Sequence, residues 1–119
     1  MNQETIDKVL KFRDDRNWRQ FHTPKDLALS LTLEAAELLE VFQWSGTDLQ
    51  CTHKKAKIEE ELADVVSYCI LMADVCHLDL DEIVRKKMDR NAEKYPVELA
   101  YGSSAKYTEL KQDSRSIKK

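Results

Sequence analysis

A long apolar stretch in the second half of the chain places the strongest constraint on its fold. Residues 62–73 have the sequence LADVVSYCILMA, which puts apolar side chains on nearly every face of a helix. A helix of this kind has to be buried on most of its sides. Other helices of the chain, or other copies of it, must therefore cover this segment.

Composition supports a helical domain of modest size. The chain has 119 residues, and its two Gly and two Pro are too few for the many turns of an all-β fold. An ordinary hydrophobic content of 42% and a formal net charge of −3 argue against a disordered chain. We therefore predict an all-α protein.

Hydrophobic periodicity predicts four helices, over residues 3–17, 24–44, 54–76 and 79–94. Thr23 is the expected N-cap of the second helix, and Pro24 its first helical residue. The short connections favour a four-helix bundle, with a domain over residues 1–96 and a polar, mobile tail over residues 97–119. Because one small bundle does not cover an all-apolar helix, we expect a homodimer or homotetramer.

Charge and cysteine content limit the partners and the location. The 19 basic and 22 acidic residues argue against a nucleic-acid binder, and residues 1–96, with 14 basic and 19 acidic residues, carry the acidic excess. Three cysteines without a C-x-x-C pair favour a reducing compartment. No apolar run is long enough for a membrane span or a signal peptide, so a cytoplasmic location is expected.

Four acidic residues occur in two pairs on the predicted helices. Glu34 and Glu37 lie on the second helix, and Glu61 and Asp64 on the third. Residues three apart share one helix face. Each acid is aligned with apolar residues of its own helix, and these include Leu27, Leu31, Val41, Ile58, Val65 and Leu71. The pattern predicts that all four carboxylates point inward.

Inward carboxylates need a partner, because burying one unpaired carboxylate costs several kcal/mol. The second and third helices offer no basic residue at a matching inward position. Protons or a cation are the remaining options, and an all-oxygen ligand set favours Mg²⁺, or Mn²⁺, over Zn²⁺. Two solvated acid pairs remain the alternative. A di-iron site is disfavoured, since it would require Glu-x-x-His motifs.

The acid pairs, together with Lys87-x-x-x-Asn91-x-x-Lys94-Tyr95-Pro96, resemble the all-α nucleoside triphosphate pyrophosphohydrolases of the MazG type. Residues 16–22, 34–44 and 60–68 are most similar to the dCTP pyrophosphatase subfamily. The resemblance implies Mg²⁺-dependent cleavage between the α and β phosphates of a deoxynucleoside triphosphate, dCTP or a modified dCTP. The products would be the monophosphate and pyrophosphate, in nucleotide-pool house-cleaning.

The resemblance also implies roles for individual residues. The expected metal ligands and catalytic residues are Glu34, Glu37, Glu61 and Asp64. The expected substrate-binding residues are Trp18, His22, Trp44, Tyr68, Lys87, Asn91, Lys94 and Tyr95. The two tryptophans would line the base pocket, and the residues from Lys87 onward would contact phosphates and sugar.

Some alternatives stay open at the level of sequence. The two tryptophans could be core residues, the basic residues could form a solvated helix face, and His22 could close a connector. Val9 stands where the related animal enzymes have a base-pocket histidine, which leaves open a broader action on non-standard nucleotides. A non-catalytic helical nucleotide-binding or scaffold module is the alternative function.

Overall fold

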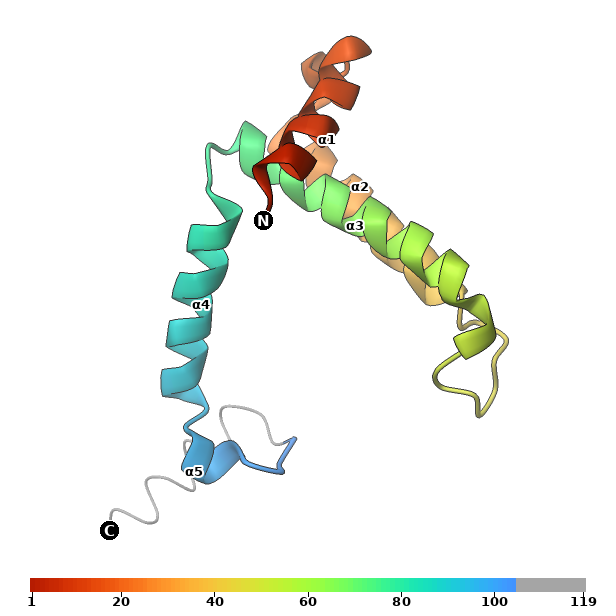
Figure 1. Cartoon of the computed structure of the whole chain (residues 1–119), viewed down its shortest axis with the longest axis vertical. Coiled ribbons are helices and arrows are strands. Elements are labelled where there is room, and N and C mark those ends of the chain that lie inside the picture. Colours follow the sequence, from red (N-terminus) through yellow and green to blue (C-terminus); the bar gives the residue numbers. More distant parts are fainter. Residues whose placement is uncertain (105–119) are drawn as a thin grey trace. The chain divides into compact units, whose positions relative to one another are not determined.

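The computed structural model describes residues 1–104, and every regular element there is a helix (Figure 1). The long helices are α1 (Gln3–Asp15), α2 (Pro24–Glu40), α3 (Lys55–Val75) and α4 (Leu80–Lys94). The short elements are the 3₁₀ turns η1 (Arg19–Phe21) and η2 (Thr52–Lys54) and the helix α5 (Val97–Ala100). The predicted all-α class is confirmed. Among the described residues, no helix combines the length and apolarity needed to cross a membrane.

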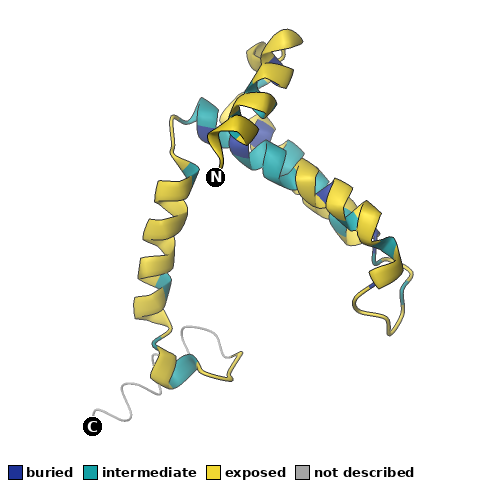
Figure 2. Ribbon diagram, in the orientation of Figure 1, coloured by how far each residue is buried: buried dark blue, intermediate teal, exposed yellow. Residues whose placement is uncertain are grey.

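The described part of the chain divides into two units, one over residues 1–80 and a second that begins at residue 81. In the first unit α2 and α3 pack side by side and α1 contacts α3 (Figure 1). Buried residues such as Leu27, Ile70 and Ala73 mark its core (Figure 2). Residues 65–75 of α3 are buried or half-buried, as the apolar stretch predicts, whereas residues 62–64 at the start of that stretch are exposed.

The second unit holds α4 and α5. The predicted domain boundary after residue 96 remains a prediction. Helix α5 lies within the segment predicted to be a polar tail, and residues 105–119 of that tail lie outside the described part of the chain.

The ends of α2 show which local signals decide its length. The hydroxyl of Thr23 accepts a hydrogen bond from the backbone N–H of Asp26 at 3.1 Å, so the predicted N-cap is correct. The predicted C-terminus at residue 44 is wrong, because the helix ends at Glu40. From Val41 onward the backbone N–H groups bond three residues back, and this tightens the chain into turns.

A partly buried ion pair joins α1 to α3. Arg13 is 3% exposed and donates from Nη1 to Oδ2 of Asp74 at 2.6 Å. Just beyond it, Asn17 takes a left-handed conformation (φ 54°), and the N–H of Trp18 donates to the carbonyl of Arg13 at 3.1 Å. This pattern closes the helix C-terminus. It fixes the position of the Trp18 backbone relative to α3.

Candidate metal centre and adjoining pocket

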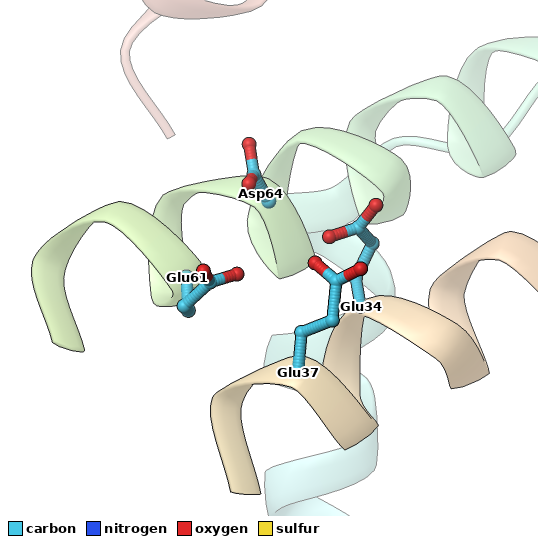
Figure 3. Close-up of side chains that lie close together, drawn as sticks. All are labelled: Glu34, Glu37, Glu61 and Asp64. Carbon is cyan, nitrogen blue, oxygen red and sulfur yellow. The ribbon is translucent and has the colours of Figure 1, made fainter. Parts of the chain in front are cut away.

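The side-by-side packing of α2 and α3 brings the two acid pairs together. Glu34 and Glu37 extend from α2 towards the segment of α3 that carries Glu61 and Asp64 (Figure 3). One carboxylate oxygen from each of the four residues lies within 4.8 Å of the others. The four acids that sequence spacing singled out therefore form one cluster.

The cluster has a buried side and an open side. Glu61 is buried and Glu34 is half-buried, whereas Glu37 and Asp64 are exposed. The expectation that all four acids point inward is wrong for the exposed pair. Most of the helix contacts in this unit are between α2 and α3, so an acid beside the apolar stripe can still reach solvent.

Burial and neighbouring negative charges oppose the ionisation of Glu34. The pKa of Glu34 is raised to about 6, chiefly because burial disfavours its charged form. A hydrogen bond with Glu37 and the negative charges of Glu37, Asp64 and Glu61 add to this rise in pKa. A bound cation would favour the charged form instead.

A basic residue that the sequence analysis overlooked partly compensates the cluster. Lys57 lies one helical turn before Glu61, and its Nζ is 2.9 Å from Glu61 Oε1. This hydrogen bond is the main reason that the pKa of Lys57 is raised. Lys57 is itself exposed, so it is not the inward basic residue whose absence the sequence indicated, but its long side chain still reaches Glu61. A single lysine nevertheless contacts only one of the eight carboxylate oxygens.

Two buried oxygen atoms test whether a metal ion fits the cluster. Oε2 of Glu34 and Oε2 of Glu61 are buried and have no hydrogen-bond partner among the described residues. Buried acceptors are normally satisfied, so each of these atoms calls for a ligand. Oxygens that bind Mg²⁺ on opposite sides lie about 4.2 Å apart, from Mg–O distances of about 2.1 Å. One carboxylate oxygen from each residue lies within 4.8 Å of the others, which is close enough for a single ion to be shared among them after side-chain adjustment. The residues fit a hard divalent cation.

A pocket of about 410 Å³ adjoins the cluster and shares Glu34 and Asp64 with it. Three predicted substrate-binding residues line this pocket, namely Trp18, His22 and Tyr68. Its other lining residues are Lys8, Val9, Phe12, Arg13, Ser67 and Leu71. The pocket therefore joins a carboxylate cluster to a wall with aromatic and apolar side chains.

Sequence reasoning overlooked part of this lining, although helical spacing could have found it. On α1 the lining residues fall at positions 8, 9, 12 and 13, which form one helix face. On α3 they fall at positions 64, 67, 68 and 71, one face that begins at an acid of the cluster. Extending the acid pair along its own face leads to Leu71, which the sequence already aligned with the acids, and would also have identified Ser67.

His22 lies in the pocket with one ring nitrogen unsatisfied. Its Nδ1 is buried and has no hydrogen-bond partner among the described residues. The pKa of His22 is lowered, chiefly by burial and further by the charge of Arg13, so the neutral ring is favoured. A neutral imidazole can both donate and accept a hydrogen bond.

The other predicted substrate-binding residues are not among the described lining of this pocket. Trp44 is 86% exposed, in the turns after α2, and is not part of the described pocket lining. Lys87, Asn91 and Lys94 lie on α4, with Tyr95 directly after it. These four residues belong to the second unit, and their contact with a substrate stays a prediction.

Comparison with known proteins identifies the family. The model of the MazG-like family matches residues 29–110. The chain belongs to the MazG-like family. The matched range contains all four acids, whereas Trp18, His22 and the α1 wall of the pocket precede it.

Curated relatives and a solved structure agree with this assignment. Mouse dCTP pyrophosphatase 1 is 43% identical over 105 residues, which cover 84% of this chain and 62% of the relative. The human protein of the same name gives the same values. The rat protein is 41% identical over 111 residues, covering 89% of this chain and 65% of the relative. The chain thus spans less than two thirds of these relatives. A crystal structure of a pyrophosphatase from Archaeoglobus fulgidus has a TM-score of 0.73 and 43% identity, and the match covers 79% of this chain and 91% of that one.

The geometry of the cluster predicts stabilisation by a divalent cation. Adding Mg²⁺ or Mn²⁺ to metal-free protein should raise the unfolding temperature, with about 2.7 kcal/mol of stabilisation at a hundred times the dissociation constant. Glu37→Gln should abolish the effect, because it removes one charged metal ligand. Glu37 is exposed, so the substitution should not disturb folding. Thermal unfolding followed by circular dichroism measures both.

Glu59→Gln, on the same helix as Glu61 but outside the cluster, is the matched control and should respond to the cation like the wild type. A Glu37→Gln protein that Mg²⁺ stabilises as strongly as the wild type would rule out the cluster as the metal site.

Proposed function

We propose that the chain is a Mg²⁺-dependent pyrophosphohydrolase of deoxynucleoside triphosphates, acting on dCTP or a modified dCTP. One observation carries the proposal, namely that the carboxylate cluster and the aromatic-lined pocket share Glu34 and Asp64. The names of the dCTP pyrophosphatase relatives and of the archaeal pyrophosphatase support the same reaction class.

The shared residues define how a nucleotide would lie. A triphosphate and an acidic cluster repel each other unless cations bridge them, so the phosphates belong at the metal centre. The base and sugar then extend into the pocket, where Trp18 offers a ring for stacking. When bound, Mg²⁺ would supply polarisation of the α-phosphate, a water of lowered pKa and compensation of the leaving-group charge.

The residues of the chain divide the remaining work. Glu34, Glu37, Glu61 and Asp64 hold the cation in place, and the general base is one of these acids, Glu40 or Glu60. The basic and polar residues of α4 and its end, Lys87, Asn91, Lys94 and Tyr95, contact the phosphates and sugar in this proposal. Lysines spaced along one helix suit phosphate oxygens as mobile point charges.

The base specificity depends on the α1 wall of the pocket. Val9 lines the pocket, and its apolar side chain offers a base no hydrogen bond at this point. If no other pocket residue supplies the hydrogen bond to the base that Val9 lacks, a broader action on non-standard nucleotides would follow. Turnover measured on a panel of dNTPs and NTPs distinguishes cytosine preference from broad action, and both from a non-catalytic binding module.

Product analysis tests the reaction. The protein is incubated with Mg²⁺ and each common dNTP and NTP, and the products are separated by ion-exchange chromatography. We expect the nucleoside monophosphate and pyrophosphate, with the fastest turnover among cytosine deoxynucleotides. Nucleoside diphosphate and orthophosphate would show cleavage at a different bond and contradict the proposal.

Substitutions in the cluster test its part in this reaction. Glu37→Gln and Asp64→Asn should each lower turnover by about two orders of magnitude or more while leaving helicity intact, because each removes a charged metal ligand. Glu59→Gln is again the control and should keep wild-type turnover. Full activity in either cluster variant would refute the role of that residue.

We also propose that the chain assembles into a homodimer or homotetramer. Four leucines on α2 and α3 are 49–70% exposed in the single chain, namely Leu29, Leu33, Leu39 and Leu62. Apolar side chains in such number favour a protein interface.

Light scattering during size-exclusion chromatography tests the assembly. The wild type should have at least twice the chain mass of 13.9 kDa, and Leu29→Glu should shift it towards the monomer. Leu49→Glu, a change at an 83% exposed loop position, should leave the mass unchanged. A wild-type protein that is monomeric at micromolar concentration would contradict the assembly.

A further inference from the structure

Two aromatic rings form a corner in the wall of the pocket. The ring centroids of Phe12 and Trp18 are 5.7 Å apart, and the ring planes make an angle of 78°. Both residues line the pocket, yet Phe12 is 51% and Trp18 is 45% exposed. Half-exposed aromatic rings beside a cavity retain apolar surface that a ligand can cover.

The corner is held in place from outside the pocket. The guanidinium carbon of Arg16 lies 3.7 Å from the centre of the Phe12 ring, which is a cation–π contact. Nη1 of Arg16 also donates to the carbonyl oxygen of Phe12 at 3.0 Å. Because Arg16 occupies one face of the Phe12 ring, the opposite face and the edge remain for other contacts.

The backbone restricts the other ring. Asn17 takes a left-handed conformation, and the N–H of Trp18 donates to the carbonyl of Arg13. Arg13 is itself tied to Asp74 of α3, so the last turn of α1 and Trp18 are fixed relative to the α3 side of the pocket. A corner ordered in this way loses little conformational entropy when a ligand binds.

We propose that Phe12 is a substrate-contacting residue that recognises the base. A flat heterocycle that stacks on one ring of the corner meets the other ring nearly at a right angle. It therefore gains a stacking contact and an edge-to-face contact at once. The inference rests on the proposed function and adds Phe12 to the residues that select the nucleotide.

The test separates base recognition from phosphate binding. Phe12→Leu keeps an apolar side chain but removes the ring, so the KM for dCTP should rise about tenfold while kcat stays within about twofold. Tripolyphosphate with Mg²⁺, which has no base, serves as a competitive inhibitor, and its inhibition constant should be unchanged. Phe12→Tyr retains the ring and should restore the wild-type KM.

Phe21→Leu provides a matched control, since Phe21 is a 64% exposed phenylalanine that does not belong to the described pocket lining. Its KM should equal that of the wild type. If Phe12→Leu does not fold, as judged by circular dichroism, Phe12→Met takes its place with the same expectations. An unchanged KM in the Phe12→Leu or Phe12→Met protein overturns the inference. An equal rise of the KM for dCTP and of the inhibition constant of tripolyphosphate overturns it as well.

Calorimetry with dCMP distinguishes this inference from the proposed function, because it requires no turnover. Wild-type binding that weakens about tenfold in Phe12→Leu supports the contact with the base. Equal binding by the two proteins overturns the role of Phe12 and leaves the proposed reaction standing. A wild-type protein that neither binds dCMP nor hydrolyses any triphosphate overturns the proposed function, and with it this inference.

Discussion

The convergence of four carboxylates between α2 and α3 is the constraint on which the rest of the site depends. Bringing like charges within a few ångströms costs free energy, and partial burial raises this cost. The chain offsets little of it, since Lys57 pairs with one oxygen of Glu61 while buried oxygens of Glu34 and Glu61 have no described partner. For stability alone, apolar residues at these positions would serve as well as the acids or better. A cation bound at the cluster would account for their presence, and an acidic cluster that holds a cation would suit a polyphosphate.

Helix α1 contributes the other half of the site. It supplies one wall of the pocket, and the ion pair of Arg13 with Asp74 anchors that wall to α3. The family model matches only from residue 29, so the wall lies outside the range that defines the family. In this arrangement the α1 wall could change without altering the acids, because all four acids lie on α2 and α3. Val9 and Phe12 are the positions on this wall at which we propose that the choice of base is made.

The sequence predicted those parts of the structure that local rules determine. Hydrophobic period and capping chemistry placed the helices and the Thr23 cap, and the three-residue spacing of the acids placed each pair on one face. The contact of Lys57 with the cluster was not predicted, because Lys57 does not occupy an inward position on its helix. It reaches Glu61 from one turn away only through its long side chain. The end of α2 was also predicted wrongly, because the side chains from Val41 to Trp44 are compatible with a helix. The helix ends where backbone N–H groups begin to bond to carbonyls three residues back. The α1 wall depends on tertiary contacts between segments about 60 residues apart, which periodicity alone does not encode.

A crystal structure of the protein soaked with Mn²⁺ tests the central claim most directly, because anomalous scattering locates the ion independently of any activity. We expect an anomalous peak between α2 and α3, bound by oxygens of Glu34, Glu37, Glu61 and Asp64 at about 2.1–2.2 Å. A map with no peak at these four residues, at Mn²⁺ concentrations that stabilise the protein, would contradict the claim that the cluster is a metal centre.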